Sequence, residues 1–279
     1  MLTKKMMGGY LASALVAGGA LAVFRTVLLY RYFDPYNNEY STDAKFSISL
    51  LGYLLLAAIL LMATSYFLLR KKDFSEFAVS QSQFSVFSSA LLGFVFAAIG
   101  FLVLLYYGGE LFAENTHTFF KTLRIICFVL LFFSAAYFVM NAAASRISVR
   151  MKKFFSFIPT VWALLFLVVS YINPAYNYTD PNHNFCNISI AALLLFFLYE
   201  TRACATGKNT PIRFIFSLIA LIVTLVYILP IFILMAFWEL PTSIDVLFEA
   251  VECGAVFYII AVICSMIQAV KPKESVSDS

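Results

Sequence analysis

Hydrophobic residues follow one another in long blocks, and short polar stretches separate these blocks. A helix that crosses the roughly 30 Å hydrocarbon core of a bilayer needs about 20 apolar residues. Inside lipid the backbone must satisfy its own hydrogen bonds, which favours helices. The pattern therefore predicts an all-α, polytopic membrane helical bundle, a single transmembrane domain over 1–279 with a polar tail at 271–279. The eight predicted spans are 7–30, 46–69, 84–107, 122–145, 155–172, 185–201, 212–238 and 245–270.

Two of the blocks carry a small residue at every fourth position. These residues are Ala14, Gly18 and Ala22 in the first block and Ser89, Gly93 and Ala97 in the third. In lipid such a stripe lets another helix approach closely. A signal peptide is the competing interpretation of the first block, but its apolar run continues to Tyr30, which favours a span that is not cleaved.

The composition excludes a soluble domain. Hydrophobic residues make up 62% of the chain, charged residues 12%, and the mean hydropathy is +0.90. No basic face lies outside the clusters that flank the spans, so nucleic acid is not an expected partner. The sequence lacks the motifs of serine hydrolases, zinc proteases and nucleotide-binding loops. We therefore expect neither an enzyme nor a cofactor.

The distribution of charge predicts the orientation. Eight spans place both termini on one side, and fourteen of the 19 Lys and Arg residues fall on that side. Because cytoplasmic loops carry the excess of Lys and Arg, both termini are predicted to lie in the cytoplasm. The expected location is a multi-pass position in the cell membrane, the cytoplasmic membrane of a bacterium.

Three carboxylates stand out at the start of the last span. Asp245, Glu249 and Glu252 are spaced so that one continuous helix would carry them on one face. The uncharged run after them, Cys253 to Ile267, spans only about 22 Å of helix, less than the hydrocarbon core. We therefore predict that Glu252, and with it Glu249, lies at membrane depth, where an ionisable group indicates function by default.

Each of these acids also has a structural interpretation. Asp245 can cap the helix with Thr242, and Glu249 can reach the interface. Glu252 can form an ion pair with Arg25 or with Arg124, which belong to the same half of the membrane. The sequence favours a direct contact between Glu252 and Arg25, since a bare carboxylate there would be costly.

Other polar residues have simpler explanations. Glu200 lies next to the predicted end of the sixth span, so we expect its side chain to extend towards the interface. Asp180, His183 and Cys186 are metal-ligand types, but their spacing matches no known site, so no metal is expected. The cysteines lack paired spacing, and most lie in or beside apolar blocks, where cysteine serves as a small hydrophobic residue.

A resemblance to a known group rests on a few residues. Arg25, the sequence Phe33-Asp34-Pro35, the pair Pro159 and Trp162, and Tyr199-Glu200 are similar to a group of uncharacterised bacterial eight-span integral membrane proteins. The likeness covers the layout of most of the chain. It implies the eight-span fold and a bacterial membrane, and it carries no activity.

Two functions are open at this point. The first is a transporter-like bundle that moves a small cationic or proton-coupled solute through an acidic outer vestibule, with Glu252, Glu249 and Asp245 as the acids. The alternative is a non-transporting membrane component that serves assembly or sensing, to which the small-residue stripes point. The expected partners are the lipid bilayer and either another membrane protein or a second copy of the chain.

Overall fold

The computed structural model describes residues 4–34, 39–70, 82–112, 118–143, 148–173, 181–237 and 244–270. Within this part of the chain, eight helical segments are long and apolar enough to cross a membrane, which confirms the predicted all-α membrane fold. The helices are α1 Lys4–Tyr32, α2 Lys45–Leu69, α3 Gln83–Phe112, α4 Thr118–Ala142, α5 Val149–Phe155, α6 Ile158–Ile172, α7 Pro181–Thr206, α8 Pro211–Phe237, α9 Ile244–Glu249 and α10 Val251–Ala269.

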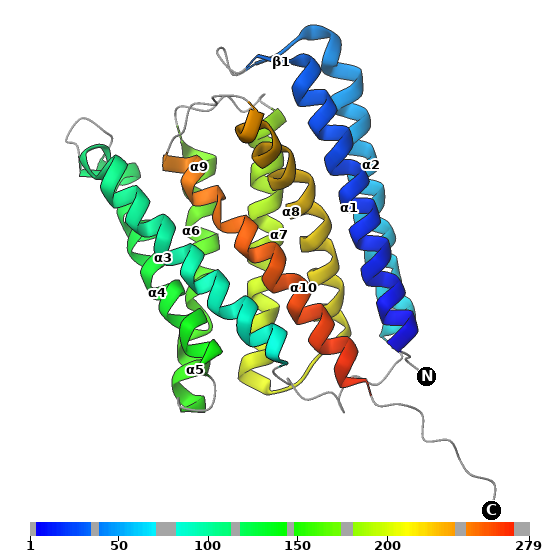
Figure 1. Ribbon diagram of the computed structural model, residues 1–279, viewed down its shortest axis with the longest axis vertical. Helices are drawn as coiled ribbons and strands as arrows, with labels where there is room; N and C mark the ends of the chain where they lie inside the picture. Colours follow the sequence, from blue (N-terminus) through cyan, green and yellow to red (C-terminus); the bar gives the residue numbers. More distant parts are fainter. Residues whose placement is uncertain are drawn as a thin grey trace, which may run out of the picture.

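The spans run up and down in one bundle (Figure 1). α1 begins and α10 ends at the same end, here called the terminal end. The opposite end, here called the distal end, holds the last turns of α1 and α8 and the first turns of α2, α7 and α10. A pair of two-residue strands, β1 Phe33–Asp34 and β2 Glu39–Tyr40, lies at the distal end between α1 and a 3-10 turn, η1 Thr42–Ala44.

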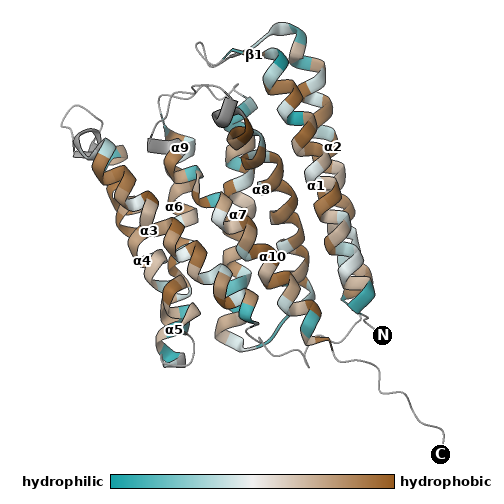
Figure 2. Cartoon of the chain, viewed as in Figure 1, coloured by the Kyte–Doolittle hydropathy of each residue, from teal (hydrophilic) through white to brown (hydrophobic). Residues whose placement is uncertain are grey.

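The core gathers around α8 and α10. In α8, 72% of the most apolar stretch is buried, and in the segment that contains α10 the value is 61%. α8 packs against α1, α2, α7 and α10, whereas α2 lies at the edge of the bundle and buries only 17%. Brown, hydrophobic residues cover the middle of the bundle, and teal residues gather towards its ends (Figure 2). This is the pattern of a protein whose sides face lipid.

Both small-residue stripes are used inside the bundle. A Cβ atom at Gly18 would lie 3.2 Å from the Cα of Ile222, so this glycine lets α1 approach α8 closely. A Cβ atom at Gly93 would lie 3.1 Å from the carbonyl oxygen of Ala135, so α3 approaches α4 in the same way. The stripes therefore serve contacts between helices of one chain. They no longer favour the interpretation of the protein as an assembly component, which needed these faces for another protein.

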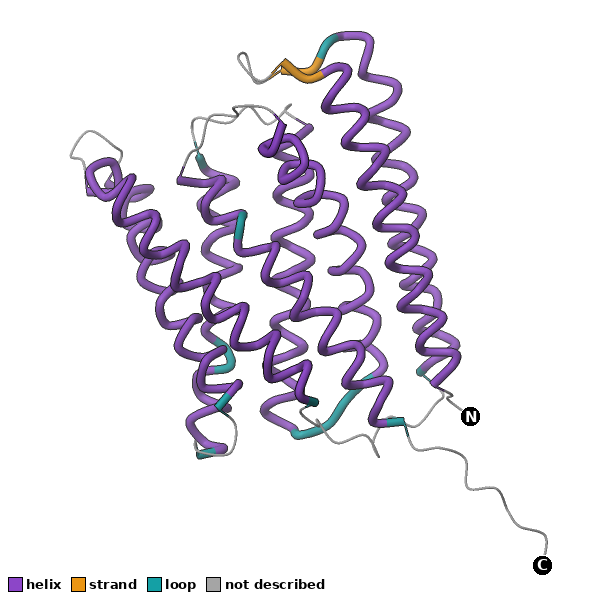
Figure 3. The backbone as a smooth tube through the Cα atoms, viewed as in Figure 1, coloured by secondary structure: helices purple, strands orange, loops and turns teal. Residues whose placement is uncertain are grey.

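Two of the segments that are long enough to cross a membrane are divided into two helices (Figure 3). A turn at Ser156 and Phe157 separates α5 from α6, and a turn at Ala250 separates α9 from α10. The prediction of one continuous helix through Asp245, Glu249 and Glu252 is therefore wrong, because Glu249 ends α9 and Glu252 belongs to the first turn of α10.

Candidate functional site

Arg25 lies inside the distal half of the bundle, with only 1% of its surface exposed. Its Nη1 donates hydrogen bonds to the backbone carbonyls of Val226, at 3.0 Å, and Tyr227, at 2.6 Å. Its Nη2 donates to Oδ1 of Asn182, at 3.1 Å. The guanidinium carbon also lies 5.0 Å from the ring centroids of Phe185 and Tyr227. A buried cation is thus held by carbonyl dipoles and aromatic faces rather than by a carboxylate.

Pro230 explains why the carbonyl of Val226 is available. Proline has no N–H, so residue 230 of α8 cannot donate the helical hydrogen bond to the carbonyl of residue 226, four positions earlier. A freed carbonyl in an apolar interior needs another donor. Arg25, which reaches α8 from α1, donates to Val226 and to the next carbonyl, that of Tyr227. Pro230 and the buried Arg25 therefore form one structural unit.

Glu249 lies next to this unit and is also buried, with 7% exposed. The Tyr227 hydroxyl donates a hydrogen bond to its Oε2, and the Cys186 thiol donates to its Oε1 at 3.3 Å. Tyr227 therefore contacts both side chains, because its ring faces Arg25 and its hydroxyl reaches Glu249. The guanidinium of Arg25 and the carboxyl group of Glu249 share this tyrosine, which connects α1, α8 and α9.

Glu252 is the most deeply buried acid of the cluster, with 1% exposed. Ser189 of α7 donates a hydrogen bond to its Oε2 at 2.5 Å. Its Oε1 has no hydrogen-bond partner among the described residues. Buried polar atoms are usually paired, and an atom that is not requires an explanation, such as a bound proton, ion or water. Glu252 is therefore the side chain of this cluster best placed to receive a ligand.

The predicted direct ion pair between Glu252 and Arg25 is wrong. Within the described chain, Arg25 donates through Nη1 and Nη2 to Val226, Tyr227 and Asn182, whereas Glu252 accepts from Ser189. The Nε of Arg25 has no hydrogen-bond partner there. The reason is geometric: α1 packs against α8, where Pro230 leaves the carbonyl of Val226 as an acceptor for Arg25. We name Arg25, Tyr227, Ser189, Glu249 and Glu252 the distal polar cluster.

Two of the predicted site residues fall outside the distal polar cluster. Arg124 places its guanidinium 4.5 Å from the ring centroid of Phe120, one turn earlier on α4, and it does not contact Glu252. The backbone of Asp245 belongs to α9, and its side chain lies outside the described part of the chain. Of the five predicted residues, the structure brings Arg25, Glu249 and Glu252 into one region.

A second buried charge cluster lies near the terminal end. Arg213 of α8 donates to Oε2 of Glu200 through Nη2, at 2.6 Å, and through Nε, at 3.0 Å. Tyr258 donates to Oε1 at 3.2 Å, and Asn209 accepts from Nη1 of Arg213. The prediction that Glu200 extends towards the interface is wrong, because α7 continues to Thr206 and keeps Glu200 inside. Both oxygens of Glu200 have hydrogen-bond partners, so this cluster connects α7, α8 and α10 and stabilises their packing.

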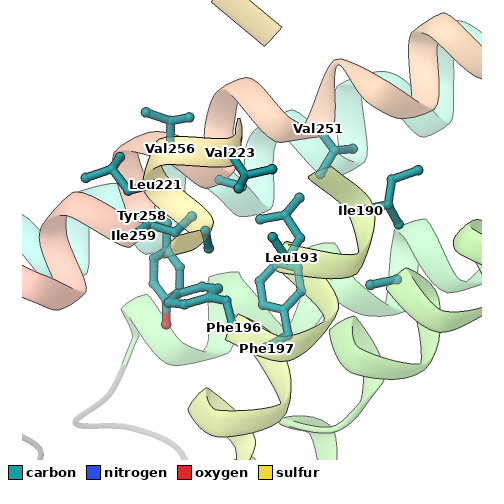
Figure 4. Close-up of a cluster of buried hydrophobic side chains, with 14 of the residues drawn as sticks. Ile190, Leu193, Phe196, Phe197, Leu221, Val223, Val251, Val256, Tyr258 and Ile259 are labelled. Carbon is teal, nitrogen blue, oxygen red and sulfur yellow. The ribbon is translucent and has the colours of Figure 1, made fainter. Parts of the chain in front are cut away.

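An apolar layer separates the two clusters. Its side chains come from α7, α8 and α10 (Figure 4) and include Leu193, Phe196 and Phe197 of α7, Leu221 of α8, and Val256 and Ile259 of α10. Ser189 and Glu200, which mark the two clusters on α7, are separated by about 16 Å of helix. In this conformation the distal polar cluster is closed off from the terminal end.

The residues of metal-ligand type have other contacts. His183 forms a hydrogen bond with Asn187 at 3.0 Å, and Cys186 donates to Glu249. Among the described residues, no group of three or more His, Cys, Asp and Glu side chains could hold a metal ion. All five cysteines are free thiols.

The carboxylates of Glu249 and Glu252 do not line an open vestibule, as the sequence had suggested, because both are buried. Sequence reasoning also missed Tyr227 and Ser189, which carry no signal of their own in an apolar block. Pro230 was the available signal, since it marks a carbonyl four residues earlier that needs a donor. Comparison with protein families, curated proteins and solved structures found no match to the chain.

Proposed function

We propose that the protein exchanges a proton for a small monovalent cation across the membrane, with Glu252 as the group that carries either of them. The observation that supports this proposal is the burial of Glu252 together with its unpartnered Oε1. An acid at membrane depth that is not locked by a basic residue is a typical coupling group of transporters. Glu200, whose two oxygens are both occupied, lacks this property.

The charge balance of the distal polar cluster favours exchange over simple binding. Arg25 and Glu249 cancel each other, so a proton on Glu252 leaves the cluster neutral. A net charge in an apolar interior is costly, so the proton can leave only if another positive charge replaces it. One monovalent cation at the Glu252 carboxylate restores neutrality. The Ser189 hydroxyl, whose oxygen lies 2.5 Å from Oε2, would provide a further ligand for that cation.

The apolar layer of Figure 4 fits the same mechanism. A transporter must not open its site to both sides at once, and the layer of Leu193, Phe196 and Phe197 closes the terminal side here. Under the predicted orientation, the distal end faces outwards. The proposed cycle therefore needs a second conformation in which these side chains separate and the distal side closes.

The exchange can be tested with vesicles that contain the purified protein and a pH-sensitive dye. Sodium, potassium or guanidinium chloride is added outside at equal internal and external pH. We expect at least one of these cations to raise the internal pH, since each cation that enters releases a proton. Glu252→Gln should slow the response at least tenfold. Asp43→Asn, which removes an exposed acid, is the matched control and should not change it. No response from the unsubstituted protein, or an equal response from Glu252→Gln, would contradict the proposal.

A further inference from the structure

A cavity of about 510 Å³ lies between α2 and α7 in the distal half of the bundle. Its wall on α2 includes Ile48, Gly52, Leu56 and Ile59, and its wall on α7 includes Pro181, Asn184, Phe185 and Ile188. All of these except Asn184 are apolar, and ligand cavities typically have volumes of about 300–1,000 Å³. We call this space the α2–α7 groove.

Gly52 shows that the groove is open at its α2 wall. A Cβ atom built on this glycine would meet no other atom within 4 Å. Gly18, by contrast, touches the backbone of α8 when a Cβ is added. Space beside an apolar wall of a lipid-facing helix cannot hold stable water, which would lack hydrogen-bond partners there. A hydrocarbon chain, which needs no hydrogen-bond partners, suits this space.

The length of the groove matches one leaflet. From Ile48 to Ile59, α2 rises about 16 Å, and half of the hydrocarbon core is about 15 Å thick. The groove begins at the first turns of α2 and α7, at the membrane boundary, and ends near the middle of the bundle. These are the dimensions of a single acyl chain of a lipid in the distal leaflet.

One exposed basic side chain, that of Lys45, stands at the boundary end of the groove. Lys45 opens α2 and lies one turn before Ile48, on the helix face that continues through Gly52 and Ile59. The N-termini of α2 and α7 point to the same end, and helix N-termini favour anions. Lys45 is exposed, so its ammonium group is free to meet a headgroup. A phosphate at this height suits both the lysine and the helix ends.

We propose that the α2–α7 groove binds one glycerophospholipid of the distal leaflet, with an acyl chain between the two helices and its phosphate at Lys45. Phe185 stands between this lipid and the distal polar cluster, because its side chain lines the groove and its ring centroid lies 5.0 Å from the Arg25 guanidinium carbon. The proposal stands independently of cation exchange, since it depends on the shape and charge of the groove alone.

The test is native mass spectrometry of the full chain, delipidated in detergent and titrated with dioleoylphosphatidylglycerol. We expect one lipid to bind at a lower concentration than all others. Gly52→Leu should raise its apparent Kd at least tenfold by filling the groove, and Leu56→Trp, which fills the same space, should do the same. Gly19→Leu is the matched control, because Gly19 also faces open space but lies on α1, outside the groove. It should leave the Kd unchanged. Lys45→Gln should raise the Kd about fivefold.

Several outcomes would overturn the proposal. Equal losses in Gly52→Leu and Gly19→Leu would indicate annular lipid only. Binding of dioleoylglycerol, which lacks phosphate, as tight as that of the phospholipid would remove the role of Lys45. A dimer in the unsubstituted protein that Gly52→Leu abolishes would identify the groove as an interface between two copies of the chain. Circular dichroism of each variant establishes that it is folded before its Kd is compared.

Discussion

Replacing Arg25 tests the structural unit that it forms with Pro230. Arg25→Met keeps much of the side-chain volume but removes the charge and the three hydrogen bonds to Val226, Tyr227 and Asn182. Polar contacts inside membrane proteins contribute about 0.6 kcal/mol on average and about 1.7 kcal/mol at most. Three such bonds predict that the free energy of unfolding falls by about 2–5 kcal/mol.

The Pro230→Ala background makes this prediction specific. Alanine restores an N–H at position 230, which can donate to the carbonyl of Val226 within the helix. The carbonyl of Val226 then no longer depends on Arg25 for a hydrogen-bond donor. The loss caused by Arg25→Met should therefore shrink by about 1 kcal/mol, the value of one polar contact.

The assay is equilibrium unfolding of the four proteins of this cycle by sodium dodecyl sulfate in mixed micelles. Arg31→Met is the matched control, because Arg31 is an exposed arginine in the last turn of the same helix, and it should change the free energy by less than about 1 kcal/mol. If Arg25→Met has the same effect in both backgrounds, within about 0.5 kcal/mol, Arg25 and Pro230 are independent and the argument fails.

Two further predictions concern the terminal cluster and the orientation. Glu200→Gln leaves Arg213 buried without its anion and should lower the free energy of unfolding by about 3–5 kcal/mol, whereas Glu252→Gln, an exchange of equal shape, should cost less than about 1.5 kcal/mol. Unfolding in the same detergent mixture measures both, and equal losses would remove the distinction between a structural and a ligand-binding acid. For the orientation, a cysteine at Thr42 should react with an impermeant maleimide in intact cells, and one at Lys208 should react only after lysis, because these exposed positions lie at opposite ends of the bundle. Labelling of Lys208→Cys in intact cells would contradict the predicted orientation.

The fold could be predicted because hydrophobicity in blocks is a local property of the chain. Each apolar block must form a helix in lipid, whatever it packs against, so the eight spans follow from the sequence. The burial of Arg25 and Glu252 could also be predicted from the sequence. A charged side chain within an apolar block usually faces the interior of the bundle, because exposure to lipid is costly.

The partners of these charges could not be predicted, because they depend on how helices distant in the sequence pack. Arg25 and Val226 are 201 residues apart, and a backbone carbonyl has no signature in the amino-acid sequence. Glu200 was misplaced for a different reason. Its position relative to the interface depended on the end of α7, which extends to Thr206, and a helix boundary is the least certain feature of such a prediction.

Arg25 lies where a conformational change would have to act. α1 and α2 stand together at one edge of the bundle (Figure 1), and Arg25 connects α1 to both α7 and α8. A movement of this pair against α7 and α8 would require the bonds to Val226, Tyr227 and Asn182 to exchange. A change in the protonation of Glu249 would act on Arg25 through Tyr227, because the Tyr227 hydroxyl contacts the acid and its ring faces the guanidinium. In the proposed exchange, a change of charge at Glu252 alters the balance of the same cluster. The residues that hold α1 in place are thus the ones that would respond to the proton.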